Sequence, residues 1–134
     1  MAVIEGTPAF KEASGEYDFA VDGGAIGTLT LRSNSSTGNT IPAGSVILGG
    51  YVEIDTAFTT GTAATMALGA EATGDLVAAT VVSGAPYSTT GRKSVIPVFT
   101  GASSVKTTVA RALTAVIATG TVTAGKGRVV VFYR

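Results

Sequence analysis

The residue types that most enzymes use for acid–base or nucleophilic chemistry are scarce in this chain. Its 134 residues include no histidine and no cysteine. Histidine is the commonest general base and metal ligand, and cysteine supplies thiol nucleophiles, disulfides and thiolate metal sites. Their absence excludes Ser-His-Asp and Cys-His catalysis, as well as metal centres built on these residues. We therefore expect no catalytic residue, no cofactor and no metal ion.

One glycine-rich stretch comes close to a phosphate-binding loop. The segment 120–127 reads Gly-Thr-Val-Thr-Ala-Gly-Lys-Gly. A phosphate-binding loop needs Ser or Thr directly after the lysine, to hold Mg²⁺, and a helix beyond it. Here Gly127 and a β-branched segment follow instead, so a turn between two strands explains the glycines better.

A second candidate is the carboxylate pair Glu53 and Asp55. Side chains at positions i and i+2 share one face of a strand, so the two carboxylates are expected to lie together. Such pairs can cleave glycosides or bind Ca²⁺, but both functions need further ligands or a cleft. A strand surface that faces solvent or a partner is the better interpretation.

The composition indicates a protein that hides much of its surface in an assembly. Charged residues make up 13% of the chain and hydrophobic residues 46%, whereas a soluble domain usually has about 25% charged residues. The alternative is a small Ala/Thr/Gly-rich β-domain with an ordinary surface. A net charge of zero predicts no nucleic-acid partner. No apolar run approaches the roughly 20 residues of a membrane span, so we expect no membrane partner and synthesis in the cytoplasm.

The distribution of charge is uneven along the chain. All nine acidic residues lie at or before Asp75, where Lys11 and Arg32 are the only basic residues. The first part of the chain therefore has a net charge of −7 and the remainder +7. This pattern allows two interpretations. Opposite faces or ends of the molecule could meet across copies or against a shell, or interleaved strands could mix the two sets in space.

Alternating polar and apolar residues predict an all-β fold in one domain. Turn residues separate eight expected strands, at 17–21, 26–32, 40–58, 64–70, 75–82, 93–99, 105–118 and 128–133. A sheet of eight short antiparallel strands must close into a barrel or fold into two packed layers, so that its edge strands are protected. The sequence therefore predicts an antiparallel β-sandwich or jelly roll spanning residues 17–134.

The longest expected strand is introduced by a tight turn. In the tetrapeptide Ile41-Pro42-Ala43-Gly44, proline fixes φ and glycine permits positive φ. Gly49 and Gly50 then mark a point where the strand can bend or bulge.

Residues 1–16 are expected to form an extended N-terminal arm. They are small, polar and turn-prone, with Val3, Ile4 and Phe10 as the only apolar anchors. An arm of this kind orders on a neighbouring subunit or shell, whereas a frayed terminus is the alternative. Together with Tyr87 in the loop 83–91, these anchors are the candidate interface residues. Low charge and several apolar strand faces also predict a homotrimer.

The central part of the chain resembles virion proteins of tailed bacteriophages. The resemblance rests on Ile41-Pro42-Ala43-Gly44 and on three further segments: Thr-Ala-Phe-Thr-Thr-Gly-Thr at 56–62, Met-Ala-Leu-Gly at 66–69 and Asp-Leu-Val-Ala-Ala at 75–79. The region of the match, from residue 41 to residue 79, covers about a third of the chain. Proteins of this type include capsid decoration, or cement, proteins.

The resemblance implies a jelly-roll body, commonly trimeric, that sits on the surface of the virion capsid. It implies a non-enzymatic protein that decorates and stabilises the shell by bridging capsomers, with the major capsid protein as its partner. Similar sequences occur in tail and fibre proteins, so a receptor- or glycan-binding module of a tail is the alternative. In that case the loops 33–39 and 83–91, the latter with Tyr87, would present the binding residues.

Overall fold

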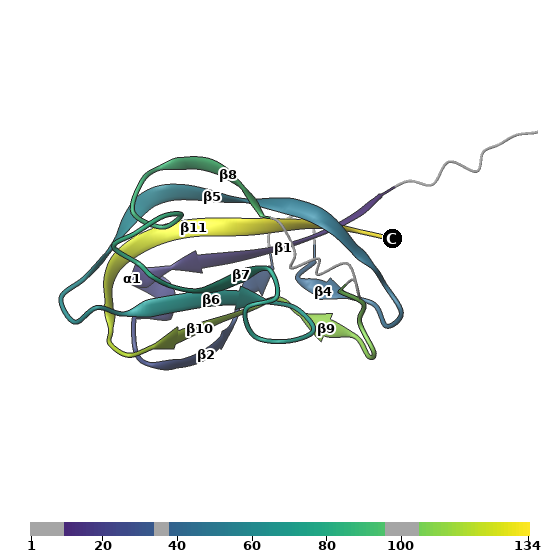
Figure 1. Cartoon of the computed structure of the whole chain (residues 1–134), viewed down its shortest axis with the longest axis horizontal. Helices are drawn as coiled ribbons and strands as arrows, with labels where there is room; N and C mark the ends of the chain where they lie inside the picture. The colour runs from purple at the N-terminus through teal and green to yellow at the C-terminus, as the bar shows by residue number, and fades with distance from the viewer. Residues whose placement is uncertain (1–9, 34–37, 96–104) are drawn as a thin grey trace, which may run out of the picture.

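The computed structural model describes residues 10–33, 38–95 and 105–134 and shows an antiparallel β-sandwich (Figure 1). Its strands are β1 (Lys11–Asp18), β2 (Gly27–Thr30), β3 (Arg32–Ser33), β4 (Thr40–Ile41), β5 (Ile47–Thr60), β6 (Thr65–Gly69), β7 (Val77–Val81), β8 (Gly91–Val95), β9 (Arg111–Ala112), β10 (Thr114–Ala118) and β11 (Val122–Tyr133). Eight of these strands have four residues or more. The prediction of an all-β sandwich with about eight strands is confirmed.

The larger sheet has five strands in the order β3-β1-β11-β5-β8. Its centre is the antiparallel pair of β5 and β11, with 14 and 12 residues. Residues at alternate positions of β5, such as Val52 and Ile54, point into the core, as the sequence pattern predicts. The pairing shifts between Gly49 and Ile47, so the expected irregularity does lie beside the glycine pair.

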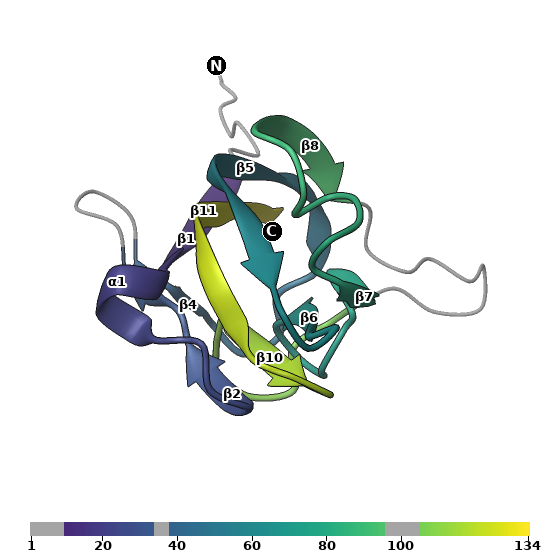
Figure 2. The ribbon, with the colours of Figure 1, turned by 90° about the vertical axis from the view of Figure 1, so that its left-hand side faces the viewer.

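The second sheet has four strands in the order β2-β10-β6-β7, and β4 with β9 forms a small two-stranded sheet. In Figure 1 the five-stranded sheet forms the upper layer and the four-stranded sheet the lower one. Figure 2, seen from the end where β10 runs into β11, shows the two layers around one interior.

The core between the sheets is apolar and contains a short aromatic stack. Phe58 lies between Tyr17 and Tyr87, with ring centroids 5.4 Å and 5.6 Å away. Gly125 passes under the Phe58 ring, where a Cβ atom would lie only 2.5 Å from the ring. The glycine is therefore required by the close approach of β11 to this ring, in addition to its φ of +146°.

The predicted boundary of the N-terminal arm is wrong for residues 11–16. These residues belong to β1, which pairs with β11 along its whole length and with β3 at Gly15 and Glu16. Ala13 is fully buried, and Gly15 fits because a Cβ atom there would lie 2.5 Å from Leu31 Cβ. The small residues that indicated an arm are thus needed for close packing inside a sheet. Residues 1–9 of the predicted arm lie outside the described residues.

The strand predicted at 17–21 ends early, at Asp18. The single helical turn α1 (Phe19–Asp22) follows. Asp18 caps this turn by accepting a hydrogen bond from the backbone N–H of Ala20 at 3.0 Å. Asp22 accepts from the backbone N–H of Asp18 at 2.9 Å and from Arg32 Nε at 3.1 Å. These hydrogen bonds therefore favour a helical turn at Phe19–Asp22, although the residues alternate as they would in a strand.

In the last third of the chain, the bounds of the strands differ from the predicted ones. The expected strand 105–118 consists of an isolated bridge between Lys106 and Val46, then β9, then β10. The chain changes sheets at Leu113, whose N–H donates to Asn39 O and whose carbonyl accepts from Leu31 N–H. The final strand begins at Val122 rather than at residue 128.

The segment 120–127 that resembled a phosphate-binding loop is mostly strand. Gly120 lies in the turn between β10 and β11, whereas Gly125, Lys126 and Gly127 lie within β11. A glycine turn explains only the first of these residues. The other two glycines allow close approach to Phe58 and to the backbone of β5.

Candidate functional site

The outer face of the five-stranded sheet carries a row of alternating charges. Adjacent strands place side by side, in this order, Arg32 of β3, Glu16 of β1, Arg128 of β11, Glu53 of β5 and Arg92 of β8. Every strand of the sheet contributes one member, with the sign changing at each step. We call this row the charge ladder.

Ion pairs join most neighbours in the charge ladder. Arg128 Nη2 lies 2.7 Å and Arg92 Nη2 lies 3.5 Å from Glu53 Oε1, and Arg32 Nη1 lies 3.9 Å from Glu16 Oε1. The hydrogen bond from Arg128 lowers the pKa of Glu53 below its ordinary value. Arg92 also stacks over the Tyr51 ring, 4.3 Å from its centroid.

The charge ladder decides between the two interpretations of the uneven charge distribution. Glu16 and Glu53 come from the acidic part of the chain, whereas Arg92 and Arg128 come from the basic part. Strand pairing places them in one row, so the two sets mix in space. Glu53 is neutralised by arginine and Asp55 is exposed, and the described residues form no cluster of acidic side chains that could hold a metal.

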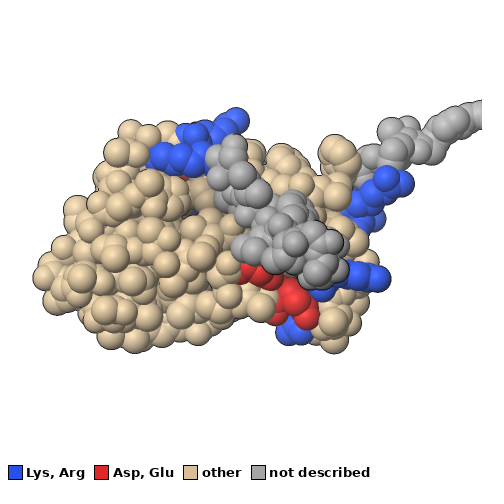
Figure 3. Space-filling model, in the orientation of Figure 1, with Lys and Arg blue, Asp and Glu red and all other residues tan. Residues whose placement is uncertain are grey.

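The four-stranded sheet is different, because none of its strands contains Asp, Glu, Lys or Arg. In Figure 3 the surface over β2, β6 and β10 is correspondingly free of blue and red. Basic groups gather over β8, and mixed charges gather at the end of the molecule near β4 and β9. The strands of the two sheets therefore differ in charge, and the nearest charged groups to the four-stranded sheet include Glu71 and Arg111, which line a cleft together with Thr28 and Thr114.

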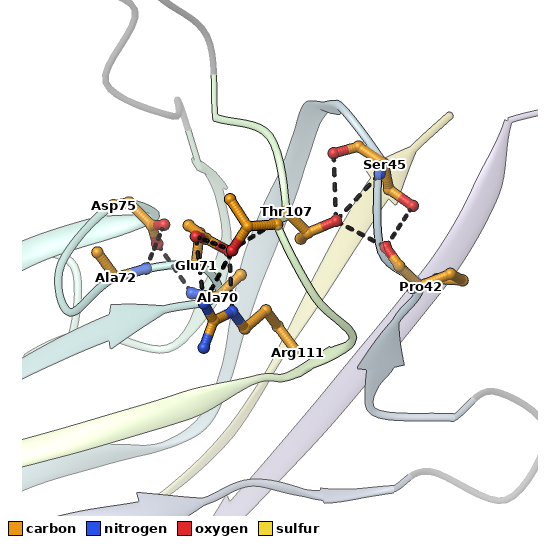
Figure 4. A network of polar contacts seen from close by, with 9 residues as sticks. Pro42, Ser45, Ala70, Glu71, Ala72, Asp75, Thr107 and Arg111 are labelled. Carbon is orange, nitrogen blue, oxygen red and sulfur yellow. Dashed lines mark hydrogen bonds and ion pairs between the residues drawn. The ribbon is translucent and has the colours of Figure 1, made fainter.

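A polar junction ties the end of β6 to the segment before β9 (Figure 4). Glu71 accepts hydrogen bonds from Arg111 Nε at 2.8 Å, from Thr108 N–H at 3.1 Å and from the Thr108 hydroxyl at 2.9 Å. The arginine bond, followed by the two threonine bonds, lowers the pKa of Glu71 to about 2. The Glu71 carboxylate is already hydrogen-bonded to Arg111 and Thr108. The junction therefore holds two chain segments together rather than binding a ligand.

A second set of contacts in Figure 4 fastens the turn that precedes β5. Thr107 Oγ1 donates to Pro42 O at 2.6 Å and accepts from Ser45 N–H at 3.0 Å. Ser45 Oγ also donates to Pro42 O at 2.8 Å. The predicted turn is present, with Gly44 at φ +79°, and its buried polar atoms are satisfied by a segment 62 residues away in sequence.

The opposite end of the sandwich is a threonine-rich tip, formed by the turns at 59–65 and 118–123. The Thr59 and Thr123 hydroxyl oxygens are 2.7 Å apart, and Thr60 Oγ1 donates to Thr121 O at 2.8 Å. Thr121 N–H in turn donates to Thr62 Oγ1 at 2.9 Å. Ala63 and Thr119 have φ of 59° and 71°, a left-handed conformation that costs energy for residues other than glycine. Hydrogen bonds between the two turns therefore hold the tip in a fixed shape.

Two hollows lie among the described residues 10–33, 38–95 and 105–134 that are not built as small-molecule sites. The first lies inside the core, measures about 20 Å³ and is lined mainly by apolar side chains, which is room for about one water molecule. The second is an open cleft of about 400 Å³ lined mostly by alanine and threonine. Its only charged side chains, Glu71 and Arg111, already pair with each other. The helical turn α1 is far too short to cross a membrane, and the described residues contain no helix that could do so.

The structure describes two of the four predicted interface residues, and these two lie in different surroundings. Tyr87 is 1% exposed, and its hydroxyl donates to Met66 O at 3.1 Å inside the core. The prediction that Tyr87 is an interface residue is therefore wrong: the loop turns this ring inward to complete the aromatic stack. Phe10 is 67% exposed just before β1, and its interface role stays a prediction. Val3 and Ile4 lie outside the described residues.

Only weak signals in the sequence indicate the charges on the two outer faces. The pattern around Glu53 predicts a strand surface, but its partner Arg128 is 75 residues away in sequence, and only the strand register brings the two side chains together. The uncharged face could have been noticed as a long charge-free stretch, because residues 107–110 and 112–125 contain no charged residue.

Two solved structures share this fold. A chain from the capsid asymmetric unit of cyanophage Pam1 has a TM-score of 0.62 and 19% identity, covering 99% of this chain and 91% of its own. A chain from the acid-stable capsid of Helicobacter pylori bacteriophage KHP30 has a TM-score of 0.60 and 12% identity, covering 92% and 86%. No family model and no curated protein matches the sequence. At these identities the likeness establishes a shared fold.

Proposed function

We propose that this chain is a non-enzymatic structural protein of a tailed-phage virion, which decorates the capsid surface and stabilises it by bridging capsomers. The observation that carries the proposal is the likeness to chains of two phage capsids over nearly the whole length of each. Sequence resemblance to virion proteins supports it independently. The proposed partners are further copies of the chain, as a homotrimer, and the major capsid protein.

The site geometry is compatible with a role in contacts rather than chemistry. The polar groups of the Glu71 junction and of the charge ladder are largely occupied by one another, which leaves broad surfaces and no reactive centre among the described residues. A decoration protein stabilises a shell because expansion or internal pressure must also break the contacts it bridges. Each set of such contacts needs roughly 1,000 Å² or more of buried surface to be specific.

Phe10 is the described part of the proposed arm. Its exposed ring lies where the chain enters β1. We propose that residues 1–10 bind a neighbouring subunit or the shell through Phe10, Val3 and Ile4. The alternative, a receptor- or glycan-binding module of a tail, is less well supported, because its candidate binding residue Tyr87 lies in the core.

Electron cryomicroscopy of the mature virion tests the proposal directly. We expect density that fits this sandwich on the outside of the head, in contact with more than one capsomer. Density for this chain in the tail, with none on the head, would contradict the proposal.

A further inference from the structure

We propose that the outer edge of β8 binds an extended, acidic segment of a partner protein, which pairs with β8 as an additional strand. The outer edge of β8 is the side of this strand that faces away from β5. The inference deepens the proposed function, because it states which kind of segment a shell protein would offer. It rests on that function only for the identity of the partner.

The first support is that one side of β8 has no strand beside it in the part of the chain that the structure describes. β8 is the terminal strand of the five-stranded sheet and pairs with β5 alone. Among the described residues, the backbone of Gly91, Arg92 and Lys93 forms no hydrogen bond with any other element. In Figure 1 β8 forms the upper margin of the sheet. Backbone groups on such an edge are ready to pair with another chain.

The second support is the way in which the charge ladder ends. Its sign changes from strand to strand, and it ends on an arginine at both edges, Arg32 on β3 and Arg92 on β8. Arg32 Nε lies 3.1 Å from Asp22 Oδ1, which no other ladder arginine contacts among the described residues. Arg92 instead shares Glu53, whose Oε1 lies 2.7 Å from Arg128 Nη2 and 3.5 Å from Arg92 Nη2. A carboxylate on a further strand, opposite Arg92, would continue the alternation.

The surroundings of the edge are positively charged. β8 contains Arg92 and Lys93 and no acidic residue, and Arg128 adds a third positive charge beside Glu53. The neighbouring part of β5 supplies two negative charges, Glu53 and Asp55, so one positive charge remains in excess. Figure 3 shows the basic groups gathered over β8. A segment that complements this edge is therefore acidic.

The Arg92 side chain is accessible and already held in position. It is 59% exposed, and its guanidinium stacks over the Tyr51 ring at 4.3 Å from the centroid. Arginine has five N–H donors in a planar fork that matches a carboxylate, and among the described residues only Nη2 has a hydrogen-bond partner. Next to it, a Cβ atom on Gly91 would meet nothing within 4 Å. Because the guanidinium is held by the ring, little conformational entropy is lost when a carboxylate binds.

These features favour an added strand from a different protein segment over a second copy of β8. Two β8 edges would place like charges opposite each other, which destabilises strand pairing. An acidic strand has the opposite effect, with Asp or Glu at the residue paired with Arg92. In strand addition the main-chain hydrogen bonds supply affinity and the side chains supply specificity. The five residues of β8 can therefore form a contact without a broad flat interface.

The test is an NMR titration of the isotope-labelled full chain with two synthetic peptides. One peptide alternates threonine with glutamate, and the other alternates threonine with lysine. We expect the glutamate peptide to shift the amide signals of β8 and to slow hydrogen exchange there, because unpaired N–H groups become hydrogen-bonded. We expect the lysine peptide to do neither. Binding of the glutamate peptide should weaken as salt is added.

Substitutions of Arg92 show whether its charge selects the peptide. Arg92→Glu should weaken binding of the glutamate peptide roughly tenfold or more, because like charges then face each other. Arg92→Ala should weaken it less, and Arg92→Lys, which keeps the charge, should retain most of the binding. Lys11→Glu is the matched control, because Lys11 is exposed on β1 and the change in net charge is the same. Circular dichroism establishes that each variant is folded.

Two results overturn the inference. In the first, the glutamate peptide shifts no β8 signal, or the lysine peptide shifts the same signals equally, so the cations do not select an acidic strand. In the second, every Arg92 variant binds the glutamate peptide as tightly as the wild type.

Binding of the wild type and Arg92→Glu to heads that lack the chain is measured in parallel. Peptide binding at β8 without any binding to heads would contradict the proposed function and leave the acidic-strand site supported. Equal binding of both proteins to heads would leave the proposed function supported and contradict the assignment of β8 to the shell.

Discussion

Substituting Tyr87 distinguishes directly between a core residue and an interface residue. The ring is 1% exposed, its hydroxyl donates to Met66 O, and its centroid lies 5.6 Å from that of Phe58. Tyr87→Ala removes a buried aromatic ring, which costs about 3–5 kcal/mol. Tyr87→Phe keeps the ring and removes one hydrogen bond, which costs about 0.5–1.5 kcal/mol.

The expected changes in melting temperature follow from these free energies and from the length of the chain. An unfolding entropy of about 2.1 cal/mol/K per residue over 134 residues gives roughly 0.28 kcal/mol/K. One kcal/mol therefore shifts Tm by about 3.5 °C. We expect Tm to fall by about 10–18 °C for Tyr87→Ala and by about 2–5 °C for Tyr87→Phe. The total stability of a chain of this length is roughly 7–20 kcal/mol, so both variants should fold at room temperature.

The assay is thermal unfolding followed by circular dichroism, at one fixed protein concentration because association raises the apparent Tm. Phe10→Ala is the matched control, since this aromatic ring is 67% exposed and its removal should change Tm by less than about 2 °C. If Tyr87→Ala melts within about 3 °C of the wild type, the ring is not a core element and the reasoning is refuted.

Three further predictions concern other parts of the molecule. Gly125→Ala should lower the free energy of unfolding by about 1–3 kcal/mol, measured by urea denaturation, because the new Cβ would lie 2.5 Å from the Phe58 ring. Glu71, with its pKa lowered to about 2 by Arg111, stabilises the fold fully above its ordinary pKa of 4.5 and loses that effect as pH falls toward 2. The Tm difference between the wild type and Glu71→Gln should therefore shrink below pH 4.5, and a constant difference would contradict the assignment. Deleting residues 2–9 should leave Tm unchanged but weaken binding to heads in a pelleting assay, and undiminished binding would mean that these residues are not an arm.

The boundary in that deletion illustrates what sequence alone could and could not predict. Alternating patterns predict the central strands, because burial of one strand face leaves a period of two, and Pro42 with Gly44 predicts the turn at Ile41–Gly44. The same reasoning misjudged residues 11–16, since Ser14 and Gly15 are typical of turns. Their strand conformation comes from pairing with β11, more than a hundred residues away in sequence.

Long-range register also explains why the functional surfaces were harder to predict than the fold. The charge ladder combines five strands whose order in the sheet is not their order in the sequence. No local pattern indicates that Arg128 lies between Glu16 and Glu53. The inward direction of Tyr87 is similarly a property of the packed core, whereas the Gly- and Pro-containing segment around it has the composition of an exposed loop.

The different outer faces have a consequence for how copies can assemble. A sandwich with two uncharged outer faces could stack through both of them, and contacts that do not close produce open filaments. Here the charge ladder occupies one face, and a second copy could pack on it only where opposite charges align and their desolvation is repaid.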